Sequence, residues 1–230
     1  EMTTKSSLLK ILEKSSRKGL GRGNLGVLVA RAGVGKTACL VHIAMDKLLR
    51  NEKLVHASLQ DSPEKVTSYY NVIFSELVKA LNLPTPSDIK VQIDKNRMIL
   101  AYLNQSFDLR RLKENLKNLS EKVGFVPDTI IVDGLDFSKA GVEMFEGFKQ
   151  LAQEFKVEVW FSALSKGTAG DTGPQAIPAP ADKVSAFFSI VIELQPTESA
   201  VELRLLKDHE SPAPLAEPVL LDPKTFLARG

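Results

Sequence analysis

Hydrophobic residues along the chain alternate between short continuous runs and longer segments with helical spacing. Short apolar runs with few charges predict buried strands at residues 25–30, 54–59, 128–133 and 157–163. Segments with apolar residues three and four positions apart predict helices at residues 36–50, 62–82 and 138–155. Strands that alternate with helices indicate an α/β fold, in which a mainly parallel twisted sheet carries helices on both faces.

Further elements are expected at both ends of the chain and in its middle. Residues 7–18 show helical spacing, and residues 87–123 are expected to form two more helices. The segment 166–183 is rich in Gly, Ala and Pro, which predicts a long mobile loop. Three β-type runs follow and predict an antiparallel C-terminal extension of the sheet, at residues 187–194, 200–207 and 218–221.

Composition limits the number of domains and the classes of function. A chain of 230 residues is enough for one large α/β domain, so residues 1–230 are expected to form one domain, with an N-terminal helix within residues 1–20. The net charge of +2 argues against a strongly basic nucleic-acid binder. No apolar stretch approaches membrane-spanning length, so no membrane partner is expected. A single cysteine, Cys39, allows no internal disulfide, which fits a cytoplasmic protein, and we expect it to pack as a small apolar side chain.

The segment that follows the first predicted strand has the pattern of a phosphate-binding loop. It consists of Ala32, Gly33, Val34, Gly35, Lys36, Thr37 and Ala38. The two glycines let the backbone curl so that successive N–H groups point at an anion, and the start of the following helix adds its positive dipole end. Lys36 is expected to reach the outer phosphates and Thr37 to hold Mg²⁺. A chance Gly-Lys-Thr would not explain the strand before the loop and the helix after it.

The third predicted buried strand ends in an acidic residue, Asp133, about one hundred residues after the loop. In proteins with a phosphate-binding loop, an aspartate at such a position holds the Mg²⁺ of the nucleotide. The alternative is an aspartate that caps a turn with Gly134. The pairing with the loop favours a metal site made of Thr37 and Asp133.

These features together resemble the RecA-like superfamily of P-loop ATPases, and among them the KaiC/DnaB-type branch. The resemblance covers most of the chain, and it is carried by Gly21-Arg-Gly23, the loop from Ala30 to Thr37, the segment 58–64, Ile131-Val-Asp133 and the β-rich end. Gly134, rather than glutamate, follows Asp133, which argues against the ABC and AAA+ classes. The resemblance implies a RecA-like fold, bound ATP and Mg²⁺, and a homo-oligomer in the form of a ring or filament. No guanine-specifying Asn-Lys-x-Asp motif is present.

The resemblance also points to the residue that positions the attacking water. KaiC/DnaB-type proteins carry a catalytic glutamate at the end of the second strand, and Gln60 occupies the matching position here. An amide can orient water but cannot take its proton, so slow hydrolysis or none is expected. Asp61 is a second candidate for this role, with a helix cap before Pro63 as its alternative, and Asp136 is a third.

Two further positions carry functional expectations from the resemblance. Near the end of the fourth predicted strand, Ser162 or Ser165 is a candidate sensor of the terminal phosphate, or a loop cap. At the end of a late strand, Lys207 matches the first cation of a Lys-x-Arg motif that reaches a neighbouring subunit, and His209 stands where arginine would be. Histidine is only partly charged near neutral pH, so weak activation between subunits is expected.

The segment 166–183 corresponds in position to loops that contact single-stranded DNA in RecA-like proteins. It carries Lys166 and Lys183 but no aromatic residue for base stacking, so DNA is weakly supported as a partner. The basic residues 110, 111, 113 and 117 are interpreted as a solvated helix face.

Three hypotheses about function follow. The first is an oligomeric KaiC/DnaB-type ATPase, which includes a single-stranded-DNA-associated form. The second is a nucleotide-binding switch or scaffold with little turnover, acting with a protein partner that the sequence does not identify. The third is a phosphotransferase, which would need an arginine-rich lid; residues 166–183 contain no arginine.

Overall fold

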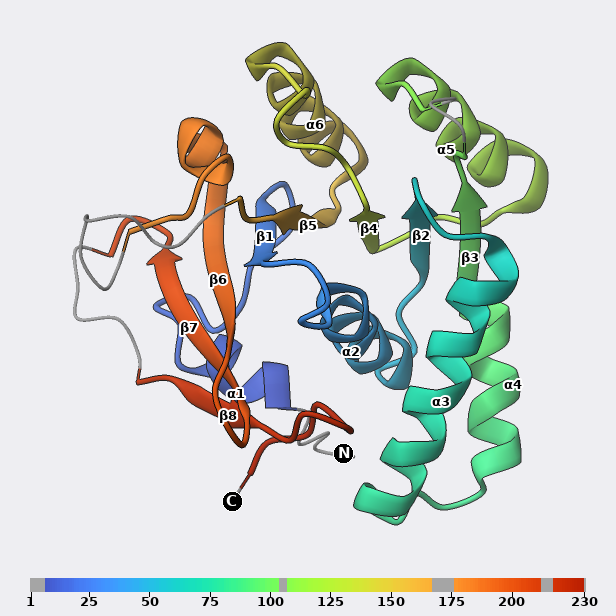
Figure 1. Ribbon diagram of the computed structural model, residues 1–230. Coiled ribbons are helices and arrows are strands. Elements are labelled where there is room, and N and C mark those ends of the chain that lie inside the picture. Colours follow the sequence, from blue (N-terminus) through green and yellow to red (C-terminus); the bar gives the residue numbers. More distant parts are fainter. Residues whose placement is uncertain (1–6, 104–106, 167–175, 212–216, 230) are drawn as a thin grey trace.

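The computed structural model describes residues 7–103, 107–166, 176–211 and 217–229, arranged around one eight-stranded sheet (Figure 1). Its strands are β1 Leu25–Ala30, β2 Leu54–Ser58, β3 Arg97–Ala101, β4 Thr129–Asp133, β5 Glu158–Leu164, β6 Phe188–Pro196, β7 Val201–Asp208 and β8 Val219–Leu221. They lie in the order β3-β2-β4-β5-β1-β6-β7-β8. Strands β1 to β6 run parallel, whereas β7 and β8 pair antiparallel. The predicted α/β class, the mainly parallel sheet and its antiparallel C-terminal extension are confirmed.

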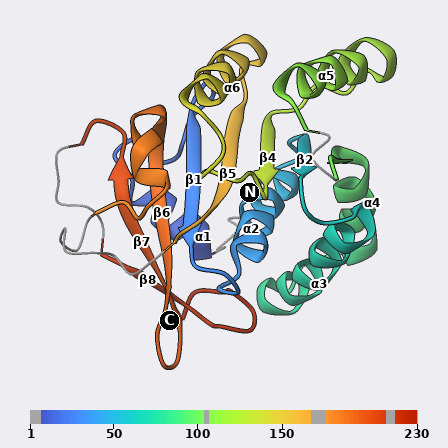
Figure 2. The same cartoon turned by 45° about the horizontal axis from the view of Figure 1, so that its top comes forward.

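Helices cover both faces of this sheet, as predicted (Figure 2). The helices are α1 Ser7–Glu13, α2 Lys36–Leu49, α3 Pro63–Leu81, α4 Pro86–Asn96, α5 Leu109–Val123, α6 Val142–Phe155 and the 3₁₀ helix η1 Ala181–Phe187. One apolar core lies between the sheet and α1 to α4, and a second lies between the sheet and α5, α6 and η1. Every residue of β1 and β4 is buried, which is what a central strand with helices on both faces requires.

The register of the sheet brings four strand ends to one edge. Ala30 of β1 pairs with Leu164 of β5, and Ser58 of β2 pairs with Asp133 of β4. The segments that follow these residues therefore leave the sheet side by side. Ligands of open α/β sheets bind at this carboxyl edge.

Strand β3 was not predicted, because residues 87–123 were expected to form only helices. The run Arg97–Ala101 contains Met, Leu and Ala, which favour helices, and no turn residue separates it from α4. Pairing with β2 at the edge of the sheet outweighs this local preference. Asn96, at the end of α4, donates a hydrogen bond to Asn51 Oδ1 at 2.8 Å and fixes the point where helix gives way to strand.

Several other boundaries differ from the prediction; α6, for example, begins at Val142 rather than at residue 138. Helix α1 ends at Glu13 rather than residue 18, because Ser15 Oγ donates to Leu12 O at 2.7 Å and accepts from Gly19 N, which turns the chain. The loop expected at residues 166–183 is shorter, because η1 begins at Ala181, whose side chain is buried. Residues 167–175 of that loop lie outside the described residues, and so do residues 1–6.

Cys39 lies on α2 and is fully buried, which confirms its packing role. Burial raises the pKa of its thiol far above the ordinary range, so it is not a nucleophile at neutral pH. In the described part of the chain, no helix is both long and apolar enough to cross a membrane.

Candidate functional site

The loop between β1 and α2 has the backbone conformation of an anion cradle. Gly33 and Gly35 have φ angles of +78° and +108°, which residues with a Cβ rarely adopt. Gly35 occupies the N-cap position of α2 and makes no side-chain cap, so the first-turn N–H groups of the helix are left for a ligand. Lys36 Nζ donates to Arg31 O at 3.3 Å and so lies over the loop. Burial lowers the pKa of Lys36, while Asp133 acts in the opposite direction.

The structure brings Thr37 and Asp133 together, although 96 positions separate them in the chain. Thr37 Oγ1 donates to Asp133 Oδ2 at 2.8 Å, and Ser162 Oγ donates to Asp133 Oδ1 at 2.6 Å. Ser162 also accepts a hydrogen bond from Gly134 N at 3.0 Å. Ser162 is a buried residue of β5 that orients Asp133, and it also lines the cavity at this edge of the sheet. Its role as a sensor of the terminal phosphate stays a prediction.

A buried histidine lies behind Asp133. His56 of β2 is fully buried, and its Nε2 lies 3.9 Å from Asp133 Oδ2, which is too far for a hydrogen bond. Its Nδ1 lies 2.9 Å from the hydroxyl oxygen of Tyr70. Burial raises the pKa of Asp133, but the neighbouring His56 and the hydrogen bonds from Ser162 and Thr37 outweigh it, so this pKa lies below its ordinary value. Asp133 is therefore an ionised, oriented carboxylate at neutral pH.

Gln60 and Asp61 follow β2 and take up different positions. Gln60 Nε2 donates to Gly134 O at 3.3 Å, which holds the amide beside the end of β4. Asp61 instead pairs with Lys65, with its Oδ1 3.0 Å from Lys65 Nζ. The cap of α3 is Ser62, which accepts a hydrogen bond from Lys65 N, so the helix-cap interpretation of Asp61 is wrong.

A cavity of about 520 Å³ opens at this edge of the sheet. Every predicted loop residue except Val34 lines it, together with Gln60 and Asp133. Val34 packs against the apolar core, and Asp61 is not part of the lining. Asp136 and Lys166 line the cavity as well.

A second, more apolar cavity of about 390 Å³ adjoins the first, because Ala38 and Tyr69 line both. Its walls come from α3 and from the C-terminal turn, which we define as residues 222–228. Phe226 of this turn has a φ of +58°, and its ring lies so close to Gly35 that a Cβ there would come within 2.2 Å of it. Sequence patterns could not identify Tyr69 or Phe226, because only the fold places residue 226 beside residue 35.

The C-terminal turn is anchored to α2 by a buried histidine. Burial lowers the pKa of His42 to about 4, so the ring is neutral at pH 7. Its Nε2 lies 3.0 Å from Thr225 O, to which it donates in the matching tautomer. The turn is thereby held against the phosphate-binding loop.

Lys207 and His209 are not brought to these cavities. Lys207 Nζ donates to Ser185 O at 2.9 Å, and His209 Nε2 lies 2.9 Å from Gly19 O, so both are engaged within their own chain. Ser165 is also absent from the lining; its backbone N donates to Ala30 O at 2.8 Å.

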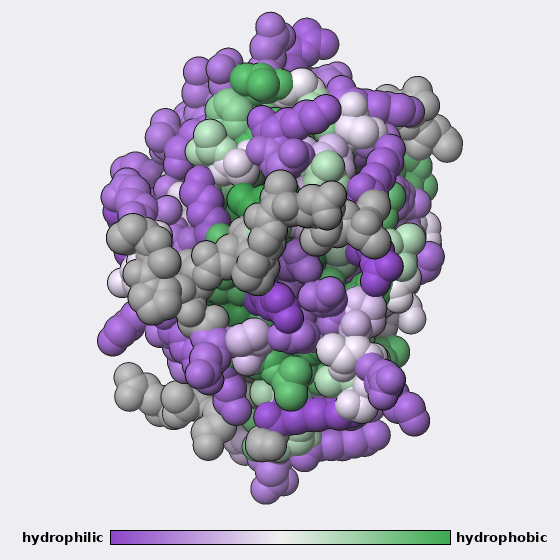
Figure 3. Space-filling model, turned by 60° about the vertical axis from the view of Figure 1, so that its left-hand side comes forward, coloured by the Kyte–Doolittle hydropathy of each residue, from purple (hydrophilic) through white to green (hydrophobic). Residues whose placement is uncertain are grey.

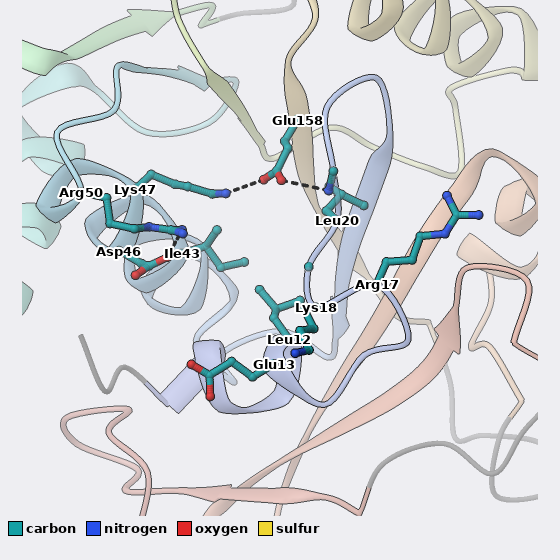
Figure 4. Close-up of a pocket in the computed structure, with 12 residues that line it drawn as sticks. Leu12, Glu13, Arg17, Lys18, Leu20, Ile43, Asp46, Lys47, Arg50 and Glu158 are labelled. Atoms are coloured by element: carbon teal, nitrogen blue, oxygen red, sulfur yellow. Dashed lines mark hydrogen bonds and ion pairs between the residues drawn. The ribbon is translucent and has the colours of Figure 1, made fainter. Parts of the chain in front are cut away.

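A third cavity, of about 250 Å³, lies at the opposite end of α2 (Figure 4). Lys47 and Glu158 point toward one another across it, with Lys47 Nζ 2.8 Å from Glu158 Oε2. Glu158 Oε1 accepts a hydrogen bond from Gly21 N at 2.9 Å. Asp46 pairs with Arg50 at its edge. These charges are paired with one another, and this cavity is separate from the phosphate-binding loop.

The oxygen atoms of Thr37 and Asp133 fit Mg²⁺, which prefers one or two carboxylates together with phosphate and water. Among the described residues, no group of three or more His, Cys, Asp or Glu side chains could hold a metal by itself. The two protein oxygens leave the remaining coordination positions of such an ion to other ligands. A scan against models of known protein families gave no match, and no curated protein matched the chain. The fold class is α/β with a mostly parallel sheet, and no family is identified.

Proposed function

We propose that this chain is a RecA-like protein that binds ATP with Mg²⁺ and hydrolyses it slowly. The observation that carries the proposal is the contact of Thr37 with Asp133 at 2.8 Å, beside a glycine-containing loop that opens α2. A hydroxyl and an ionised carboxylate at this position, next to uncapped helix N–H groups and a lysine, are the parts that a Mg-nucleoside triphosphate requires.

Each part of the site has a distinct role in this proposal. The loop N–H groups and Lys36 bind the phosphates. Thr37 and Asp133 would hold Mg²⁺, and Ser162 keeps Asp133 oriented. When bound, the ion would offset phosphate charge and fix the geometry of the outer phosphates. Gln60, held by Gly134 O, orients the attacking water by hydrogen bonds.

The second cavity supports a nucleoside as the rest of the ligand. It continues from the phosphate cavity past Ala38 and Tyr69, and Tyr69 and Phe226 offer aromatic surface. A purine base fits such an apolar pocket, because its faces stack on aromatic rings. The choice of ATP over GTP rests on the resemblance of the sequence.

Slow turnover follows from what the site contains. Gln60 cannot accept a proton, and general-base help is worth roughly 10²–10⁴-fold. Lys207 and His209 are engaged within their own chain, and this favours a site that works slowly in a single chain over one that needs a neighbour's cations. A second candidate function is a nucleotide-dependent switch or scaffold without turnover, which the amide at position 60 also favours. DNA association remains a weaker hypothesis.

The first experiment measures ATP binding and steady-state phosphate release with Mg²⁺ for the unmutated chain and for Lys36→Ala. Lys79→Ala is the matched control, because Lys79 is exposed on α3 and lies outside all three cavities. We expect Lys36→Ala to abolish both binding and turnover and Lys79→Ala to change neither.

Three outcomes separate the proposals. Turnover that Lys36→Ala removes supports the slow ATPase. Tight ATP binding without phosphate release supports the switch or scaffold. An unmutated chain that binds no ATP would overturn the proposed function in both forms.

A further inference from the structure

The first cavity contains a second lysine besides Lys36. Lys166 follows β5 and lines the cavity. Its backbone is fixed by a hydrogen bond, because Lys166 N donates to Ala179 O at 3.0 Å. The side chain is exposed, but its ammonium is held: Lys166 Nζ donates to Ser138 Oγ at 3.2 Å.

Ser138 in turn is fixed by Asp136, which also lines the cavity. Ser138 Oγ donates to Asp136 Oδ1 at 2.5 Å, and Ser138 N donates to the same oxygen at 2.9 Å. The proton of the hydroxyl is therefore directed to the carboxylate, and its oxygen is left to accept from the ammonium of Lys166. The ammonium of Lys166 therefore bonds to a neutral hydroxyl and also interacts with the charge of Asp136, which holds it at the cavity without a direct ion pair among the described contacts. A phosphate oxygen, which carries more charge than a hydroxyl, makes a stronger hydrogen bond with it.

We propose that Lys166 contacts the terminal phosphate of the bound nucleotide from within the same chain and so distinguishes a triphosphate from a diphosphate. This inference rests on the proposed function. A triphosphate carries more negative charge than Lys36 and one divalent ion offset, and no arginine is among the described residues that line the first cavity. Lys166 supplies this further cation next to the terminal phosphate, which ATP has and ADP lacks.

A direct contact of Lys166 with the terminal phosphate can be distinguished from a long-range effect of its charge. Lys139 also acts on Asp136 through its charge, but it does not line the cavity. A contact with the terminal phosphate should appear only for triphosphates and only at residue 166. A long-range effect of charge should appear for both nucleotides and at both lysines.

The test measures the dissociation constants of ADP and of a non-hydrolysable ATP analogue, each with Mg²⁺, by displacement of a fluorescent nucleotide. The chains compared are unmutated, Lys166→Ala, Lys166→Arg and, as the matched control, Lys139→Ala. We expect Lys166→Ala to weaken the ATP analogue about tenfold and ADP by no more than about twofold, since a charge-assisted hydrogen bond is worth about that much. Lys166→Arg should retain most of the preference, and Lys139→Ala should leave both constants unchanged.

The inference is overturned if Lys166→Ala leaves the ratio of the two constants unchanged, or if Lys139→Ala changes it equally. The proposed function still stands in that case if the unmutated chain binds ATP and Lys36→Ala does not. If the unmutated chain binds neither nucleotide, the proposed function fails and this inference falls with it.

Discussion

At the scale of single residues, the contact between Gly134 and Gln60 provides a test of the proposal that Gln60 positions the attacking water. Gly134 has a φ of +96°, and a Cβ there would lie 2.8 Å from Gln60 Cγ. Gly134→Ala should therefore push the Gln60 side chain away, and strain at this φ adds about 1–2 kcal/mol. We expect turnover to fall about tenfold while ATP affinity changes little, as for an interaction made in the transition state.

A double-mutant cycle checks this prediction. Gln60→Ala alone should lower turnover by a similar factor, and the double variant should lose no more than either single variant. Additive losses in phosphate release would show that Gly134 acts on the site by a route other than Gln60. Gly124→Ala controls for backbone strain alone, because Gly124 also has a positive φ but does not line the cavity.

Residue-scale prediction from the sequence was uneven for a physical reason. The loop from Ala32 to Ala38 is a local pattern, and Asp133 ends a run that is unmistakably a buried strand, so both were found. His56, by contrast, looks like any polar residue in a strand. Its position behind Asp133 depends on the pairing of β2 with β4, which short-range patterns do not encode.

At the scale of elements, α2 carries a buried acid at the end opposite the phosphate-binding loop. Asp46 is 4% exposed, it pairs with Arg50, and its Oδ1 accepts no hydrogen bond from the described residues. Burial raises the pKa of Asp46 to about 6, although Arg50 and Lys47 oppose the change. The folded chain therefore binds this proton more tightly than the unfolded chain does.

The consequence is a dependence of stability on pH. As pH rises from about 4 to about 6, Asp46 ionises readily in the unfolded chain but not in the folded one, so its contribution to the free energy of unfolding falls by up to about 3 kcal/mol. Asp46→Asn should remove this slope and be more stable than the unmutated chain at pH 7. Urea unfolding from pH 4 to pH 7 measures it. Asp94→Asn, which alters an exposed acid, should leave the slope in place; equal slopes in all three chains would contradict the prediction.

Element boundaries were predicted best where the neighbouring residues carry a clear local signal, such as the glycine-containing loop between β1 and α2. β1 and the start of α2 agree with the expectation residue by residue. β3 was missed because its five residues show no alternation and its pairing partner, β2, lies more than thirty residues earlier in the chain. An edge strand of this kind is specified by the sheet it joins rather than by its own sequence.

At the scale of the whole molecule, the outer strand β7 of the sheet extension bears on the predicted ring or filament. Figure 3 shows the side of the molecule that carries β7, where hydrophilic residues predominate among the described residues and the hydrophobic ones form small patches. Stable subunit interfaces usually have an apolar centre. This side therefore gives little support to the predicted ring or filament, and Lys207, on β7, is engaged with Ser185 O rather than extended toward a neighbour.

The last prediction concerns the number of chains that the reaction needs. Because Lys207 and His209 are bound within their own chain and Lys166 lines the cavity in cis, ATP turnover per chain should stay constant as protein concentration is raised about a hundredfold. Lys207→Ala should change turnover by no more than about twofold, since it loses only a hydrogen bond to a backbone carbonyl. Phosphate release at several protein concentrations, with light scattering of the same samples, measures both quantities. Turnover that rises with concentration and falls in Lys207→Ala would instead show that a neighbouring chain completes the site.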